Sequence, residues 1–505
     1  MRGALLVLAV VAVAPPARAQ CPDGAPPPCA RPVAGPAPNS VAVLPFANLM
    51  HDSADAYLAQ GLASEISNSL AGVPRLEVRS PALAQRPTGN AAPDPRALGR
   101  RLGVRYVVEG DFQRGGDRIR VRVRLITVAT GTQRWSNAFT RPVADLLAVQ
   151  EEIASEVAAS IAGQLLPQER AALAVRATSD PAAYDHFLRG NFLLARRTPQ
   201  DIARAIDEYG QATRLDPGLA QAHARIGLGY ALTLERGWAP ATATDSLLAL
   251  GFRSADRALA RDSMSADGWM ARGYLLAIRD PLEYAGALPA FERAVALDPR
   301  NPEVLHQYAS KLYELGQFER AIVMERRALT IDPARPVSQL QLGIVFIAQR
   351  RLVEALRAYD SAITIDPSYL DGYLNRAQLH AMRGEGSAAR ADADEALRLS
   401  SGSRRSAWAM QAAALAITGD SAAATIAIER ALVGDEAGAA SRMDRTSCAF
   451  GLSMLGRTEE AITLLERLPR GAVSWANLTA TFDLLRANPR YQRLLEANRP
   501  SGAPR

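Results

Sequence analysis

Residues that could carry catalysis or hold a metal are few in this chain and do not gather. The five histidines are scattered, and no HExxH or other metal-ligand spacing connects them. The cysteines form no CxxC pair, and there is no Walker loop, no GxGxxG and no GxSxG motif. Asp392, Asp394 and Glu395 cluster within one helical turn, which is typical of a solvated helix face. The sequence therefore favours a protein that is not an enzyme and uses neither a metal nor a cofactor.

The most regular charged pattern is an arginine-rich strand. Residues 118–125 read RIRVRVRL, and because side chains alternate along a strand, the four arginines share one face. They are Arg118, Arg120, Arg122 and Arg124. One interpretation is a face that binds anions or an acidic partner; the favoured one is a solvated face whose charge discourages edge aggregation. The net charge of +6 comes without a Lys/Arg run or a recognition module, so we expect no nucleic-acid partner.

The first 19 residues predict export. Arg2 precedes a short apolar stretch, and Ala17-Arg18-Ala19 has the small-x-small pattern of a signal-peptide cleavage site. That stretch is too short to span a bilayer, and no later segment is apolar for long enough. We expect a periplasmic or extracellular protein without a transmembrane helix, and peripheral association with the cell envelope stays open.

Residues 20–40 predict a Pro-rich linker that carries a disulfide. Cys21 and Cys29 flank the loop CPDGAPPPC, and an oxidising compartment preserves disulfides. We expect these two cysteines to pair, with two free thiols as the alternative. Gln20 is a poor match to the small residue that lipid attachment requires, so a lipid anchor is not expected.

Residues 41–165, called the module below, show the patterns of one α+β domain. The expected strands are 41–46, 76–78, 106–112, 119–126 and 133–140, and the expected helices are 55–71, 96–102 and 143–166. This order, βαβαβββα, implies one mixed sheet with helices packed on it.

An interval of 34 residues recurs further along the chain. An Asp-Pro pair ends successive units at Asp298, Asp332 and Asp366, each 34 residues apart. This period predicts tetratricopeptide (TPR) units, helix–turn–helix pairs that stack because one pair cannot bury its apolar face alone. We expect an all-α TPR superhelical solenoid over residues 179–470, with about seven to eight helical pairs, closed by capping helices over 471–498.

Two places depart from the repeat pattern. Glu325 stands where the second helix of its pair should carry an aromatic side chain. The second repeat is about a dozen residues too long, and we expect the excess, near Gly237 to Asp245, to form a loop or a lengthened helix.

The module resembles a known family. The segments VAVLPFANL, AYLAQGLASEISNSL and LLAVQEEIASEVAASI are similar to the amino-terminal domain of TolB and related bacterial modules, over residues 41–163. The resemblance implies a module that is often followed by TPR repeats and, in many relatives, preceded by a protein kinase or a winged-helix DNA-binding domain. We expect neither effector domain here, because too few residues precede Val41. A six-bladed propeller is also absent from the sequence, so the resemblance ends with the module.

The inner face of the first helix in each pair is the expected binding surface of the solenoid. Spacing places eight candidate residues there: Met270, Tyr274, His306, Tyr313, Leu340, Ile344, Ile347 and Gln378. Leu340, Ile344 and Ile347 form an apolar stripe, which favours an amphipathic helix or an extended peptide as ligand. Packing inside the solenoid is the alternative for each candidate. The candidates include no Lys or Asn, so a clamp for a C-terminal carboxylate is not expected.

The leading hypothesis is an exported, non-enzymatic adaptor of the bacterial envelope. In this hypothesis the module binds one protein partner and the solenoid another, and the two fold separately. One alternative is a sensory or regulatory module that lacks its effector domain and binds a small ligand. Another is an accessory subunit of an envelope enzyme complex.

Overall fold

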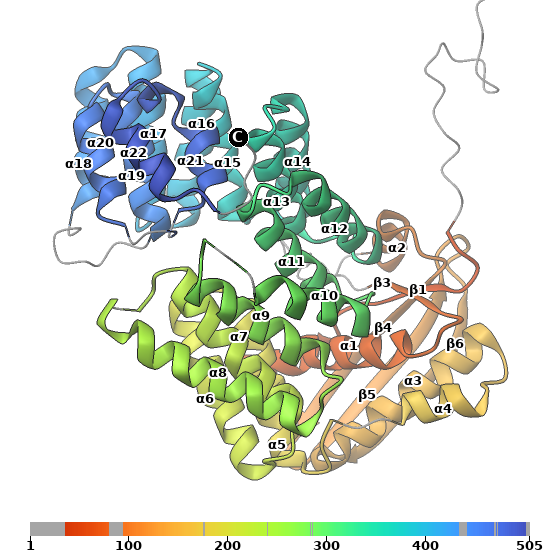
Figure 1. The fold of residues 1–505 in the computed structure, drawn as a ribbon. Helices are drawn as coiled ribbons and strands as arrows, with labels where there is room; N and C mark the ends of the chain where they lie inside the picture. The colour runs from red at the N-terminus through yellow and green to blue at the C-terminus, as the bar shows by residue number, and fades with distance from the viewer. Residues whose placement is uncertain are drawn as a thin grey trace, which may run out of the picture.

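Figure 1 shows a small mixed α/β unit followed by a long array of paired helices. The computed structural model describes residues 36–79, 94–174, 177–239, 241–282, 284, 286–433, 442–468, 471 and 473–500. The expected signal peptide and the expected Cys21–Cys29 disulfide lie outside the described residues.

The module is built on one mixed sheet with the strand order β3-β1-β4-β5-β6, in which β2 pairs only with β4. The strands are β1 (Ser40–Val43), β2 (Ala47–Asn48), β3 (Glu77–Arg79), β4 (Tyr106–Gly115), β5 (Arg118–Thr127) and β6 (Gln133–Pro142). β1 runs parallel to both of its neighbours, whereas β4, β5 and β6 form an antiparallel meander. The two-residue strand β2 was not expected from the sequence, because it is too short for a periodic pattern.

Helices cover both faces of this sheet. α1 (Ala56–Ala71) and α3 (Leu146–Ala162) pack over the apolar residues of β5, which include Val121 and Val123. α2 (Pro95–Leu102) packs on the opposite face through Leu98 and Leu102. The alternation in β5 thus places its apolar side chains inside and its arginines in solvent, as the sequence predicts.

The remaining helices form consecutive antiparallel pairs. A short helix, α4 (Pro167–Leu173), follows the module. The described pairs are α5 (Pro181–Ala195) with α6 (Pro199–Leu215), α7 (Ala220–Glu235) with α8 (Thr244–Arg261), α9 (Ala266–Arg279) with α10 (Ala287–Leu297), α11 (Pro302–Glu314) with α12 (Phe318–Ile331), α13 (Pro336–Ala348) with α14 (Leu352–Ile365), α15 (Leu370–Met382) with α16 (Gly386–Leu399), α17 (Arg405–Thr418) with α18 (Ser421–Leu432), and α19 (Arg442–Met454) with α20 (Thr458–Glu466). Two further helices, α21 (Trp475–Thr481) and α22 (Pro489–Ala497), end the described chain.

At least two of the pairs are held by a glycine that admits an aromatic ring. A Cβ atom placed on Gly343 of α13 would lie 2.2 Å from Cε1 of Tyr359 in α14, closer than any real contact. Gly190 of α5 lies against Tyr209 of α6 in the same way, at 2.5 Å. The small and aromatic positions of the repeat pattern are therefore one packing contact, which fixes how closely the paired helices approach.

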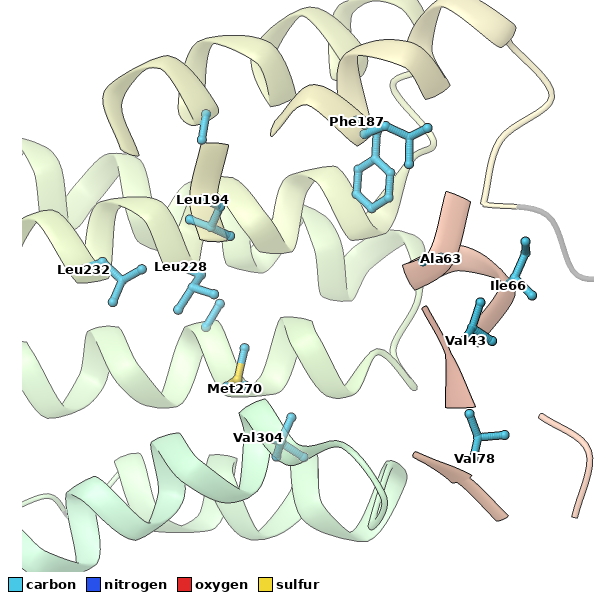
Figure 2. Close-up of a cluster of buried hydrophobic side chains, with 14 of the residues drawn as sticks. Val43, Ala63, Ile66, Val78, Phe187, Leu194, Leu228, Leu232, Met270 and Val304 are labelled. Carbon is cyan, nitrogen blue, oxygen red and sulfur yellow. The ribbon is translucent and has the colours of Figure 1, made fainter. Parts of the chain in front are cut away.

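The module and the repeats share one hydrophobic core, although the sequence predicts that they fold separately. Figure 2 shows this core running from Val43 of the sheet through Ile66 of α1 to Phe187 of α5 and Met270 of α9. Polar contacts also cross the boundary: the hydroxyl of Tyr184 donates to Oε1 of Gln150 at 2.5 Å. The module is therefore packed against the repeat array and is not a separate domain joined by a linker.

Candidate functional site

The first helices of the pairs and helix α1 together enclose one large hollow of about 2090 Å³. Its wall comes from α1, from α5, α7, α9, α11, α13 and α15, and from the chain between Gly471 and Asn477. The module supplies Gln60, Ser64 and Glu65 to this wall. A ligand inside the hollow would thus meet both parts of the protein.

Six of the eight inner-face candidates line the hollow: Tyr274, His306, Tyr313, Leu340, Ile344 and Gln378. Met270 and Ile347 do not, because their side chains pack into the core, with 1% and 7% of their surface exposed. Of these six candidates, only Ile344 and Gln378 are more than slightly exposed. The apolar stripe expected on α13 is therefore split, with Ile344 facing the hollow and Ile347 buried.

The hollow is lined by many charged side chains as well as apolar ones, so it is not the uniformly apolar groove that the stripe predicts. Acidic side chains stand near the starts of inner helices, where the helix dipole favours them: Asp267 on α9, Glu303 on α11 and Asp371 on α15. The basic residues that line the same space are Arg196, Arg197, Arg225, Arg236, Arg300, Lys311, Arg335, Arg404 and Arg445. Sequence reasoning missed these groups because most of them lie at helix ends, outside the central positions of the repeat pattern.

Lys311, the only lysine of the chain, lies at the centre of one charged cluster. Its Nζ lies 3.0 Å from Oε1 of Glu235 and 2.8 Å from Oε1 of Glu314, and 4.8 Å from the centre of the Tyr274 ring. Burial alone would lower the pKa of Lys311, but the two carboxylates outweigh it and raise the pKa. Lys311 thus lines the hollow beside the eight candidate positions, none of which is a lysine, and its charge is already paired.

A second cluster is centred on Glu303. Its Oε1 lies 2.7 Å from Nη2 of Arg197, and its Oε2 lies 2.9 Å from Nη2 of Arg335. Burial opposes the charge of Glu303, but the two guanidinium groups hold its pKa well below the usual range. This carboxylate therefore ties the end of α5 to the starts of α11 and α13.

Glu325, the residue that breaks the repeat pattern, has a specific partner. It is fully buried, and its Oε1 lies 2.7 Å from Nδ1 of His306 on the inner face of α11. The positive charge of Arg335 also acts on it. A buried acid that shares a hydrogen bond with His306 thus stands where the aromatic contact would be, and of the two residues only His306 lines the hollow.

The arginine face of β5 points away from the hollow, into solvent. Nε of Arg122 lies 2.7 Å from Oδ1 of Asp111, and Nη2 of Arg124 lies 2.7 Å from Oε1 of Glu109, both acids being on the neighbouring strand β4. Arg118 and Arg120 are exposed and make no ion pair within the described residues. This geometry supports the solvated-face interpretation over a dedicated anion site.

The described part of the chain has no helix long and apolar enough to cross a membrane. Among the same residues, no cluster of three potential metal ligands is found.

Two family models match parts of the chain. Residues 37–156 match the family described as HilA/YgeH-like transcriptional regulator, second domain, and residues 283–344 match the tetratricopeptide repeat. The second match confirms the TPR prediction in the central repeats. The module matches the first family, and its resemblance to TolB stays a prediction.

The curated relatives are longer than the matched region. The "Putative adenylate cyclase 3" of Rhizobium meliloti (strain 1021) is 31% identical over 246 residues, which cover 48% of this chain and 40% of that protein. The cytochrome c-type biogenesis protein CycH of Pseudomonas aeruginosa is 32% identical over 118 residues, which cover 22% of this chain and 28% of that protein. This chain therefore spans less than half the length of either relative.

Solved structures with a similar fold are distant. PilF of Pseudomonas aeruginosa is 21% identical, with a TM-score of 0.34, and the match covers 42% of this chain and 90% of that one. A human IFIT1 dimer with PPP-AAAA is 14% identical, with a TM-score of 0.45, and the match covers 64% of this chain and 84% of that one.

Proposed function

We propose that this chain is a non-enzymatic protein-interaction scaffold that binds a segment of its partner inside the hollow. The observation that carries the proposal is the hollow itself, about 2090 Å³ enclosed by the inner helices and α1. Pockets for drug-sized molecules measure about 300–1000 Å³, so the space suits a stretch of polypeptide better than a metabolite. The TPR match in the central repeats supports a protein as the partner.

The charged wall favours an extended acidic segment over an amphipathic helix. In three ion pairs of the wall, the arginine is more exposed than its acid: Arg225 with Asp267 (25% against 17%), Arg236 with Glu235 (31% against 14%) and Arg404 with Asp371 (33% against 22%). Each arginine has five N–H donors and uses only some of them in its contact with the acid. All three side chains line the hollow, and the Nη donors that their acids leave free suit carboxylates and backbone carbonyls of a bound segment.

The export signal that the sequence predicts in residues 1–19 supports a place in the bacterial envelope for this scaffold. The partner would then be a periplasmic, extracellular or membrane-attached protein. The resemblance of the module to TolB, as a module and not as a whole protein, agrees with this location.

Site-directed photocrosslinking tests the proposal. A benzophenone side chain replaces Gln341, which lines the hollow, or Val353, which is 59% exposed on α14. After irradiation in an envelope extract, we expect a defined covalent adduct at position 341 and none at position 353. Adducts at position 353 alone, or at neither position, would contradict the proposal.

A second candidate function is a regulatory module whose effector domain belongs to another protein. The match of residues 37–156 to a domain of transcriptional regulators and the likeness to a protein named as an adenylate cyclase favour it. Incubation of the purified chain with ATP and Mg²⁺ separates enzyme from scaffold. The scaffold proposal expects no cyclic AMP, and its formation would overturn the non-enzymatic assignment.

A further inference from the structure

Helix α21 does not simply cap the last helical pair but returns to the middle of the array. It packs against both α11 and α13 near the middle of the array (Figure 1). Ala476 and Ala480 are buried in the core that the module shares with α5 to α14, whereas Leu478 and Phe482 belong to the separate core of the last repeats. One short helix therefore joins the two cores.

The residue that holds the end of α21 has an unfavourable backbone. Arg350 follows α13 with φ of +61°, at the position where Gly316 follows α11 and Gly384 follows α15. A residue with a Cβ atom is strained in this region, which glycine occupies freely. Strain of this kind persists where the surrounding structure makes use of it.

The side chain of Arg350 explains why the strain is kept. Its Nη1 donates to the carbonyl oxygen of Ala480 at 3.2 Å, and its Nη2 donates to that of Thr479 at 3.2 Å. Nη2 also lies 2.6 Å from Oδ1 of Asp483. These carbonyls belong to the end of α21, where a helix has no internal partners for them. Arg350 thus caps α21 from 129 and 130 residues away.

A second strained arginine follows the same rule. Arg197 has φ of +53° at the equivalent position after α5, and its guanidinium reaches Glu303, 106 residues further along the chain. At both turns a glycine position is occupied by an arginine that makes a long-range contact. The two arginines therefore connect helices of the array that lie far apart in the sequence.

The chain leading into α21 closes one side of the hollow. Gly471 lies against the loop after α9, where an added Cβ would be 2.6 Å from Cγ of Pro281. Ser474 makes a side-chain hydrogen bond with Tyr313 of α11, and Ser474 and Asn477 line the hollow. A ligand that enters from this side must move the segment aside.

We infer that residues 473–485, here called the strap, are a releasable lid over the hollow, an autoinhibitory contact that a partner displaces. The inference rests on the proposed function, because it concerns access to the same hollow. The strap contacts the shared core only through Ala476 and Ala480, which bury little apolar area, whereas Leu478, Phe482 and Leu485 anchor it in the core of the last repeats. Its hold on the inner face therefore comes mainly from polar contacts, the hydrogen bonds from Arg350 and the one between Ser474 and Tyr313.

The first test measures release without any partner. Arg350→Gly removes three contacts with the strap and relieves the backbone strain, so the repeat stays folded. Arg351→Ala is the matched control, because Arg351 pairs with Glu354 and stacks on Phe346 within its own repeat. In the full chain, amide hydrogen exchange of residues 473–485 should be about tenfold faster in Arg350→Gly than in wild type or the control. Equal exchange in all three proteins would overturn the inference.

The second test asks whether the vacated surface binds the strap again. Ala480→Asp places a charge in the core contact and releases the strap while leaving Arg350 in place. A fluorescent synthetic peptide of residues 473–486 should then bind this full-length variant, but neither wild type nor the Ala480→Asp/Arg350→Gly double variant. Absence of binding to Ala480→Asp would mean that the strap is a fixed part of the fold.

These two tests separate the lid from the proposed function. Both are read without a partner, so unchanged exchange refutes the lid and leaves the scaffold standing. Failure of the crosslinking experiment refutes the scaffold and leaves the exchange result standing.

Discussion

The two ends of the repeat array are built differently. The N-terminal body, residues 36–365, carries the sheet, α1 to α14 and one shared core, in which about a quarter of the buried apolar residues are alanines. The C-terminal arm, residues 370–468, has its own core, in which half of them are alanines. Because a buried alanine contributes far less than a buried leucine or aromatic residue, the arm is held together more weakly. The comparison indicates that the body is the more strongly packed part of the molecule and the arm the less strongly packed part.

The largest effect is expected when the module is separated from the repeats. A fragment of residues 36–174 loses the contacts of α1 with α5, including those of Gly61 with Leu188, and exposes one side of its core. We predict that this fragment does not fold alone, as measured by circular dichroism and thermal melting. A cooperative melt of the fragment would show that the module is independent, as the sequence first suggested.

The two isoleucines of α13 test which side of the helix belongs to the body. Ile347→Asp places a charge in the core and should cost about 3–5 kcal/mol of unfolding free energy. Ile344→Asp faces the hollow and should cost less than about 1 kcal/mol. Urea denaturation of the two variants measures both values. Equal losses would mean that the stripe on α13 is buried throughout.

Much of the repeat architecture is readable from the sequence, because it depends on local contacts. The spacing of Gly343 and Tyr359 records a contact between neighbouring helices, and the alternation in β5 records which side of a strand is buried. The contact of Arg197 with Glu303 depends instead on the pitch of the whole superhelix, which no local pattern contains. Glu325 was recognisable as a misfit, but its partner His306 could be identified only in three dimensions.

The cluster around Lys311 tests whether charge holds the body together. Lys311→Met leaves Glu235 and Glu314 close together without their cation, and breaking a buried pair in this way costs about 3 kcal/mol. The change should lower the unfolding free energy of the body and leave exchange in α17 to α20 unchanged. If the triple variant Lys311→Met/Glu235→Gln/Glu314→Gln is as unstable as the single one, the carboxylates are not the cause.

Glu65 makes the stability of the body depend on pH. Burial raises its pKa from 4.5 to about 7, although Arg225 partly offsets this effect. Because the folded state binds this proton more tightly, the stability of the wild type falls as the pH rises from about 4.5 through about 7. Glu65→Gln removes the ionisation and should be more stable than wild type at pH 8 by on the order of 1–3 kcal/mol, with no gain below pH 4.5.

Denaturant melts across this pH range measure the effect of Glu65. Glu152→Gln, on an exposed position of α3, is the control and should show no such dependence. A constant difference between Glu65→Gln and wild type at every pH would contradict the assignment to Glu65.

Native-state hydrogen exchange in increasing denaturant tests most directly whether the body is one unit. The account predicts that β1 and β4 of the module open together with α5 to α9, at one common free energy, and that α17 to α20 open at a lower one. Separate opening of β1 and β4, at a free energy unlike that of α5 to α9, would contradict it.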